Sequence, residues 1–447
     1  MKIHARVYVL FSLLALIMIA SCQNPDSSDS PSGPWLEKAI QAEGFIAQGQ
    51  YESDQGWTWR TLPDSLEAMA DYSLYSGVPG ICLFYLELYH VTGDPSHLLT
   101  AEKGGAYLLR RIPDTIPPAE ALGLYTGVAG IGYTLGELYR STQQEQYLDG
   151  LQECLQILAA SATPTSNGGI EWGGGINDIV YGAAGIGLFM EYAAAQLDIP
   201  EGDSLAILVG EGLLANAIDT AGMLRWRFMP EYERFMDNFS HGTAGVAYFL
   251  TRLNMRTGEK AYLEAALQAT RLLDALADER GFIPHHYPGG EDLFYLSWCH
   301  GPAGIARLYS ALFEATKDPI WEEELFAAAQ NMLEEDLNPE AQPGFWKNAG
   351  KCCGTTSLAE YYLWLYQKSG ESLYLNQALE LTAQVIQNAQ VEAGTMKWVH
   401  AEHRVLPDFV QAQSGLMQGS AGIGLWLLAL EQHQAGKSPF VQLVDYQ

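Results

Sequence analysis

The sequence predicts an all-α protein, an (α/α) toroid of about seven helix-pair repeats around a central cavity. Three observations support this. A short motif recurs, in which a glycine is followed by two small residues and usually by a second glycine. Apolar residues at helical spacing follow each copy, as in Ile423, Leu425, Leu427 and Leu428. The chain shows no alternation of strands and helices of the kind that predicts a parallel sheet.

The motif copies set the repeat length. Their first glycines are Gly77, Gly127, Gly182, Gly242, Gly301, Gly354 and Gly419. Successive positions in this series differ by 50, 55, 60, 59, 53 and 65 residues. A period of this size is typical of an architecture in which one supersecondary unit recurs. Within a unit, a polar break separates the first helix from a second amphipathic helix, such as the one expected from Tyr262 to Ala277. The glycines are expected to start the inner helices, where they permit a tight turn and close helix approach.

The N-terminus predicts export. Lys2 and Arg6 precede an apolar run that is short for a membrane span and that ends in "IASC" at Cys22. This pattern predicts a lipoprotein signal peptide over residues 1–22, with lipid attached to Cys22; a plain secretory signal is the alternative. Residues 23–34 are rich in Ser, Pro and Asp and predict a disordered tether, and residues 35–447 would form the toroid. We therefore expect an exported lipoprotein, periplasmic or at the cell surface, that meets the membrane by its lipid anchor only.

The charge balance excludes one class of partner. The formal net charge is -29, and Lys and Arg together number only 24. A nucleic-acid groove needs clustered cations, which this sequence lacks, so no nucleic-acid partner is expected. The acidity could attract a cationic peptide, but solubility explains it as well.

Cysteine and histidine gather at equivalent positions of successive repeats. Directly before the first glycines stand Ser76, Thr126, Tyr181, His241, His300, Cys353 and Gln418. One step earlier stand Tyr75, Tyr125, Val180, Ser240, Cys299, Cys352 and Met417. In a closed toroid these fourteen ring positions face one end of the cavity.

The three cysteines among these ring positions predict a Zn²⁺ site. Cys299, Cys352 and Cys353 head two neighbouring repeats, and zinc binds thiolates tetrahedrally, with one position open when it is catalytic. The alternative is three inert buried cysteines. His300 is left open as a fourth ligand, a hydrogen-bonding neighbour or part of the wall.

Three motifs, "FSHGTAG", "SWCHGPAG" and "KCCG", resemble the lanthionine synthetase C-like cyclases, zinc-dependent enzymes that close thioether rings in lanthipeptides. That family holds zinc with a cysteine followed by a Cys-His or Cys-Cys pair. The resemblance therefore implies zinc on Cys299, Cys352 and Cys353, a Cys-Cys-Cys variant. It also implies catalytic roles for His241 and Asp178, although His241 alone could be structural and Asp178 could cap a helix.

Two departures from the family pattern stand out. Copy six lacks the second glycine, because Ser357 stands there, and Tyr295 replaces an arginine that some members carry ahead of the first zinc cysteine.

The resemblance implies a Michael addition. A cysteine thiol of a peptide would add to dehydroalanine or dehydrobutyrine, with His241 as general acid and Asp178 orienting it or the thiol. Because the chain carries no dehydratase region, a separate dehydratase would prepare the peptide. Three alternatives stay open: transfer of a small, glutathione-like thiol, a zinc-dependent peptide- or thiol-binding lipoprotein, and a carbohydrate-active (α/α) toroid enzyme.

Overall fold

A computed structural model describes residues 33–66, 71–335, 348–401 and 404–446. The signal peptide and most of the tether fall outside these ranges and stay predictions. Within them, no helix has the length and apolar character to cross a membrane. The first described helix, α1, begins at Pro34, next to the expected start of the toroid at residue 35.

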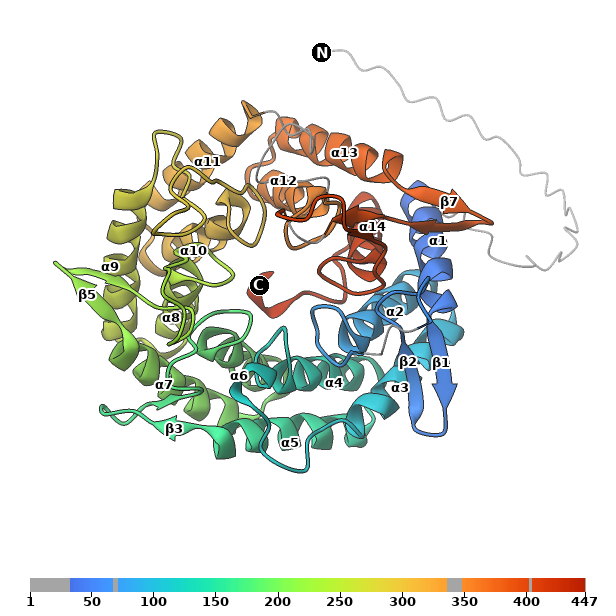
Figure 1. Cartoon of the computed structure of the whole chain (residues 1–447), viewed down its shortest axis with the longest axis horizontal. Helices are drawn as coiled ribbons and strands as arrows, with labels where there is room; N and C mark the ends of the chain where they lie inside the picture. Colours follow the sequence, from blue (N-terminus) through green and yellow to red (C-terminus); the bar gives the residue numbers. More distant parts are fainter. Residues whose placement is uncertain (1–32, 67–70, 336–347, 402–403, 447) are drawn as a thin grey trace, which may run out of the picture.

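The described part of the chain forms a closed ring of fourteen α-helices in two layers (Figure 1). Seven inner helices surround the axis: α2 (Val78–Thr92), α4 (Val128–Thr142), α6 (Ala183–Leu197), α8 (Thr243–Thr257), α10 (Pro302–Thr316), α12 (Thr355–Ser369) and α14 (Ser420–Gln434). Seven outer helices cover them: α1 (Pro34–Gln48), α3 (Pro95–Leu109), α5 (Glu145–Ser161), α7 (Pro200–Asn216), α9 (Lys260–Leu276), α11 (Ile320–Leu333) and α13 (Ser372–Gln387). The predicted (α/α) toroid of seven pairs is confirmed.

The seventh pair is built from both ends of the chain. The sequence predicts a second helix after each glycine motif, but among the described residues no α-helix follows α14, only a short 3-10 helix at Val444–Tyr446. Helix α1 packs against α14 instead, and the Leu36 N–H donates to Glu431 Oε2 of α14 at 3.2 Å. The N-terminal helix therefore covers the last inner helix and closes the ring.

Burial distinguishes the two layers. In α6 every residue from Ala183 to Ala194 is buried, as expected for a helix with neighbours on all sides. In α9 the buried residues recur at helical spacing on one face: Tyr262, Ala265, Ala266, Ala269, Thr270, Leu272 and Leu273. The inner layer is thus the core of the molecule, and the outer helices are amphipathic covers.

The repeated glycines permit close backbone approach. Each first glycine precedes an inner helix with an extended backbone and a negative φ, so no left-handed turn is involved. A Cβ at Gly127 would lie 1.7 Å from the Ala121 carbonyl oxygen, and one at Gly242 would lie 1.7 Å from the Met236 oxygen. The loop before each inner helix therefore folds directly onto the start of that helix.

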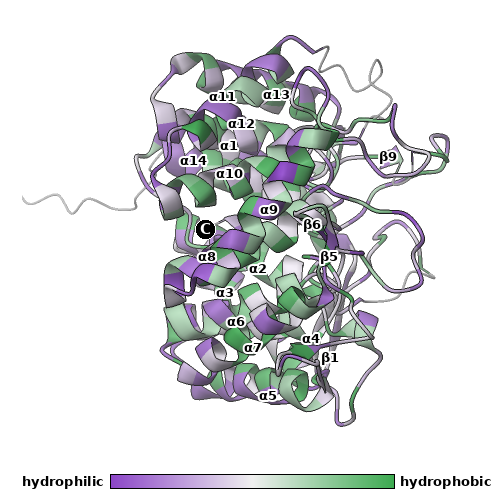
Figure 2. Ribbon diagram, turned by 90° about the vertical axis from the view of Figure 1, so that its left-hand side faces the viewer, coloured by the Kyte–Doolittle hydropathy of each residue, from purple (hydrophilic) through white to green (hydrophobic). Residues whose placement is uncertain are grey.

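Short β-hairpins gather at the end of the ring where inner helices begin (Figure 2). Four of them follow outer helices: β1 (Gln50–Ser53) with β2 (Gly56–Trp59), β3 (Thr163–Pro164) with β4 (Ile170–Glu171), β5 (Ile218–Thr220) with β6 (Met223–Arg225), and β7 (Gln390–Glu392) with β8 (Thr395–Lys397). Strands β9 (His400–Ala401) and β10 (Val410–Gln411) form a fifth antiparallel pair. The hairpins and the glycine motifs thus share one end of the toroid.

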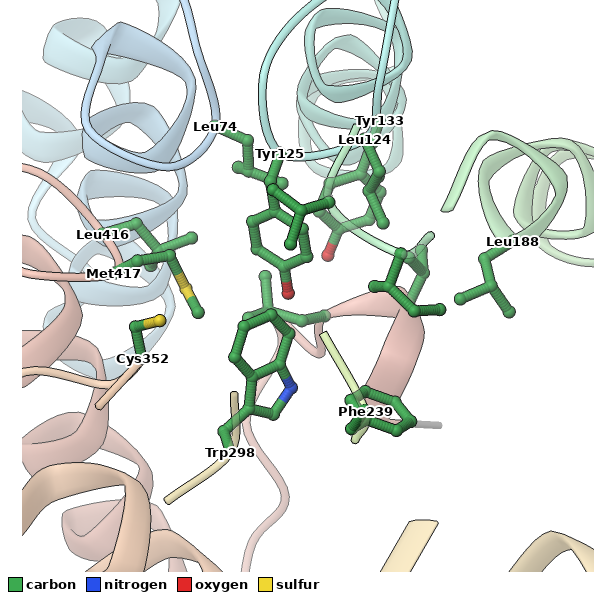
Figure 3. Close-up of a cluster of buried hydrophobic side chains, with 14 of the residues drawn as sticks. Leu74, Leu124, Tyr125, Tyr133, Leu188, Phe239, Trp298, Cys352, Leu416 and Met417 are labelled. Atoms are coloured by element: carbon green, nitrogen blue, oxygen red, sulfur yellow. The ribbon is translucent and has the colours of Figure 1, made fainter. Parts of the chain in front are cut away.

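The C-terminal segment fills the middle of the ring (Figure 1). Asp445 is fully buried and accepts hydrogen bonds from Tyr125 Oη and Trp298 Nε1, both at 2.8 Å. Tyr125 and Trp298 pack edge to face with ring centroids 5.3 Å apart, and Cys352 lies to one side of them (Figure 3). The carboxylate of Asp445 therefore connects the last residues of the chain to Trp298, the neighbour of Cys299.

Candidate active site

Backbone hydrogen bonds connect the positions two before each first glycine around the ring, with Ile179 as the donor in place of Val180 in the third repeat. The Cys299 N–H donates to the Cys352 carbonyl at 3.2 Å, and the Cys352 N–H donates to the Met417 carbonyl at 2.9 Å. The remaining donor and acceptor pairs are Met417 to Tyr75, Tyr75 to Tyr125, Tyr125 to Val180, Ile179 to Ser240 and Ser240 to Cys299. All seven repeats thus meet at one end, as the repeat register predicts.

This ring brings the three predicted zinc ligands together. Cys299 Sγ lies 3.1 Å from Cys353 Sγ, and Cys353 Sγ lies 3.3 Å from Cys352 Sγ. The three sulfurs lie within 4.8 Å of one another, and all three residues are buried. One zinc ion with Zn–S bonds of about 2.3 Å needs three thiolates grouped in this way. The donor set therefore fits zinc.

Hydrogen bonds among the three thiols shift their pKa values in different directions. Burial opposes ionisation of Cys299, but hydrogen bonds from Cys352 and Cys353 outweigh it and hold the pKa of Cys299 well below its usual value. The same hydrogen bonds raise the pKa of Cys352 and of Cys353. A bound metal ion would hold all three side chains as thiolates, because metal-ligating cysteines are deprotonated.

The residue that breaks the glycine pattern in copy six connects two repeats. Ser357 Oγ accepts a hydrogen bond from the Trp298 N–H at 2.7 Å, and both residues are buried. A glycine here would leave that buried N–H without this partner. The first departure from the family pattern therefore joins the start of α12 to the segment that carries Cys299.

His241 and Asp178 form a hydrogen-bonded pair. His241 Nδ1 lies 2.7 Å from Asp178 Oδ2, and Asp178 Oδ1 accepts from the Tyr181 N–H at 3.0 Å. The Asp178 side chain is fully buried, whereas 23% of the His241 side chain is exposed. Burial raises the pKa of Asp178, and the hydrogen bond with His241 opposes this rise. With Nδ1–H donated to the carboxylate, Nε2 is the atom that can exchange a proton with a substrate.

A second imidazole group borders the pair. The His300 ring lies 5.6 Å from His241 and 4.2 Å from His285, measured between ring centroids. Burial lowers the pKa of His285 to about 4, and burial also holds the pKa of His300 well below its usual value. Within the described residues, His300 Nδ1 has no hydrogen-bond partner. Both rings are therefore neutral near pH 7.

His285 is a site neighbour that the sequence analysis did not assign. It lies in the connection between repeats four and five, outside the repeat register, so the alignment of copies gives no signal for it. Tyr295, which stands in place of the expected arginine, packs edge-on against His285 with ring centroids 4.4 Å apart. Tyr295 and His285 thus form an aromatic pair beside His300.

A family model and solved structures were found that match this chain. Residues 68–443 match the family described as lanthionine synthetase C-like protein. The fold is similar to that of nisin cyclase, with a TM-score of 0.66, 16% sequence identity, and coverage of 92% of this chain and 96% of that chain.

A weaker similarity relates the chain to an inactive variant of the α-1,6-mannanase GH76A of Salegentibacter sp. HEL1_6, which has a TM-score of 0.49 at 13% identity and covers 89% and 99% of the two chains. A search among curated proteins found no match. Because the family match spans most of the sequence and includes every glycine motif, the chain belongs to the lanthionine synthetase C-like family.

Proposed function

We propose that this protein is a zinc-dependent, thioether-forming cyclase that adds a peptide cysteine thiol to dehydroalanine or dehydrobutyrine. One observation carries the proposal. Three buried thiols and His241, which is paired with Asp178, lie at ring positions in a chain that belongs to the lanthionine synthetase C-like family. A separate dehydratase would supply the dehydrated serine and threonine residues.

Cys299, Cys352 and Cys353 would hold the zinc ion, since the three sulfurs fit its preferred donors. When bound, zinc supplies the Lewis acidity that keeps a substrate thiol deprotonated near neutral pH. Three protein ligands leave room for that thiol, which is the arrangement typical of catalytic zinc rather than structural zinc.

His241 and Asp178 would transfer the proton of the substrate thiol to the α-carbon of the product. Asp178 accepts from Nδ1–H of His241 and so leaves Nε2 as the nitrogen that would exchange a proton with the substrate. The substrate thiol gives its proton to Nε2, and the new C–S bond forms as the electron pair of the C=C bond moves to the α-carbon and its carbonyl. His241 then donates the proton to the α-carbon. No proton is gained or lost overall, and Asp178 stabilises the imidazolium form between the two transfers.

The ring positions disfavour the carbohydrate-active alternative. Glycosidases of the common type use two carboxylates that face the scissile bond. None of the fourteen ring residues is a carboxylate, and Asp178, which lies next to the ring, is hydrogen-bonded to His241. The site therefore offers thiols and imidazole where such an enzyme needs a pair of acids.

A mass-spectrometric assay tests the proposal. A peptide with one cysteine and one dehydroalanine is incubated with the protein, with and without an external thiol, and then treated with an alkylating reagent. Ring closure leaves the mass unchanged and removes the alkylatable thiol, and it supports the cyclase. Addition of the external thiol would indicate a transferase instead. An unreacted peptide that nevertheless binds would indicate a binding protein, and Cys352→Ala serves as the inactive control.

A further inference from the structure

A chain of buried polar side chains ends at two of the predicted zinc ligands. Gln418 Nε2 lies 3.0 Å from Tyr75 Oη and 4.0 Å from Cys353 Sγ, and Asn348 Nδ2 donates to Gln418 Oε1 at 2.8 Å. Tyr75 also lies beside Cys352, and its hydroxyl acts to lower the pKa of that thiol, against the effect of the neighbouring Cys299. We propose that Asn348, Gln418 and Tyr75 position hydrogen-bond donors that stabilise negative charge on Cys352 and Cys353.

The direction of this chain follows from its first member. The Gly350 N–H can only donate, and it donates to Asn348 Oδ1 at 2.7 Å. The amide NH₂ of Asn348 therefore points to Gln418, whose Oε1 accepts. The NH₂ of Gln418 is then directed at Tyr75 Oη and at Cys353. Because Tyr75 Oη accepts from Gln418, its own proton is left for Cys352.

Burial of Asn348 and Gln418 increases the contribution of their hydrogen bonds. Asn348 is 1% exposed and Gln418 is 5% exposed, so neither amide can exchange its partner for bulk water at low cost. Hydrogen bonds to an ionised acceptor are about twice as strong as those between neutral groups. This hydrogen-bond chain thus directs two donors at the buried side chains of Cys352 and Cys353.

The hydrogen-bond chain formed by Asn348, Gln418 and Tyr75 suits a zinc site with three cysteine ligands, because of the charge of that site. Three thiolates around a divalent cation leave a net negative charge, and a bound substrate thiolate adds another. In family members that carry a Cys-His pair, an imidazole replaces one thiolate and the charge is one unit smaller. We infer that Tyr75 and Gln418 offset the additional charge that Cys353 brings, an inference that rests on the proposed zinc site.

Zinc affinity, measured by competition with a chromophoric chelator on the full chain, tests this role. Tyr75→Phe and Gln418→Met each remove one donor and nearly preserve volume. We expect each variant to bind zinc about 10- to 100-fold more weakly than the wild type, the range found when hydrogen-bond partners of metal ligands are removed. Tyr361→Phe is the matched control, because the hydroxyl of Tyr361 on α12 is buried and has no hydrogen-bond partner in the described part of the chain. Its zinc affinity should equal that of the wild type.

Repeating the Tyr75→Phe substitution in a Cys353→His variant tells whether Tyr75 offsets the charge of the zinc site or only packs against it. In Cys353→His, which converts the ligand set to the Cys-His form, Tyr75→Phe should weaken zinc binding less than about threefold. Cobalt(II) substitution adds a spectroscopic readout, since loss of a donor to Cys352 should shift the sulfur-to-cobalt charge-transfer band of Tyr75→Phe but not that of Tyr361→Phe.

The outcomes are distinct. If the wild type binds zinc and Tyr75→Phe binds it equally well, the inference is overturned and the proposed function stands. An equal loss of affinity in the wild-type and Cys353→His backgrounds would also overturn it, because a structural role does not depend on ligand charge. A wild type that binds no zinc would overturn both the inference and the proposed function.

Discussion

At the scale of single residues, the site combines groups that no one repeat contains. His241 comes from the fourth copy of the motif, and Asp178 comes from the segment that leads into the third. Their contact fixes the imidazole so that Nδ1 is committed to the carboxylate. The family resemblance implied both residues, with Asp178 orienting either His241 or the thiol, and the folded ring places Asp178 in contact with His241.

The first prediction concerns this contact. Asp178→Asn keeps the shape of the side chain but no longer favours the tautomer with hydrogen on Nδ1. We expect kcat for thioether formation to fall by about 10²- to 10⁴-fold, with zinc content unchanged and KM nearly unchanged. Steady-state kinetics together with metal analysis checks this result. Asp203→Asn, on outer helix α7, should behave as the wild type, and a fully active Asp178→Asn would remove Asp178 from the mechanism.

At the scale of elements, the residue that replaces the second glycine of the motif in copy six connects two neighbouring repeats. The sequence marks Ser357 only as a missing glycine. In the structure, its hydroxyl accepts from the Trp298 N–H and so connects the two repeats that carry the zinc thiols. Residue type could not reveal this, because the acceptor and the donor meet only when α10 and α12 are neighbours in the ring.

The second prediction follows from that hydrogen bond. Ser357→Ala should lower the free energy of unfolding by about 1–3 kcal/mol, the cost of leaving a buried N–H unsatisfied. It should also weaken zinc retention, because Trp298 precedes Cys299. Denaturant unfolding and a chelator challenge measure the two effects. Ser310→Ala, in the middle of α10, provides a comparison, and an unchanged stability of Ser357→Ala would show that the segment does not depend on this bond.

At the scale of the whole molecule, the ring is closed by contacts between distant parts of the sequence. Helix α1 covers α14, and the C-terminal segment enters the ring, where the Val441 N–H donates to Glu87 Oε2 at 2.8 Å. Glu87 is fully buried on inner helix α2, and burial raises its pKa from 4.5 to about 7. The carboxyl group is therefore more easily protonated in the folded protein than in the unfolded chain.

The third prediction is a pH dependence of stability. Because the pKa of Glu87 is raised in the folded protein, the protonated carboxyl group stabilises the fold fully below about pH 4.5. This stabilisation is lost as the pH rises through 7. Glu87→Gln removes this loss, so the variant should be more stable than the wild type at pH 8, by at most about 3 kcal/mol. The difference should disappear near pH 4.5. Thermal unfolding at both pH values measures it, with the exposed Glu201→Gln as control, and an equal difference at both pH values would contradict the assignment.

The sequence predicts the seven-pair toroid because the glycine motif recurs with regular spacing, and it predicts the three thiols because they share one register. It does not predict that α1 completes the seventh pair, since the pairing joins the two ends of the chain. The contacts of Tyr75 and Gln418 with Cys352 and Cys353 are missed for the same reason. These residues belong to the first, seventh and sixth repeats and meet only after the ring has closed.

The central claim is that Cys299, Cys352 and Cys353 hold one zinc ion on which thioether formation depends. The most direct measurement is zinc content by metal analysis, determined in parallel with ring closure of a dehydrated cysteine peptide, for the wild type and for Cys352→Ala. The account predicts about one zinc per wild-type chain, and loss of both zinc and ring closure in the variant. Full ring closure by metal-free protein, or by Cys352→Ala without zinc, would contradict it.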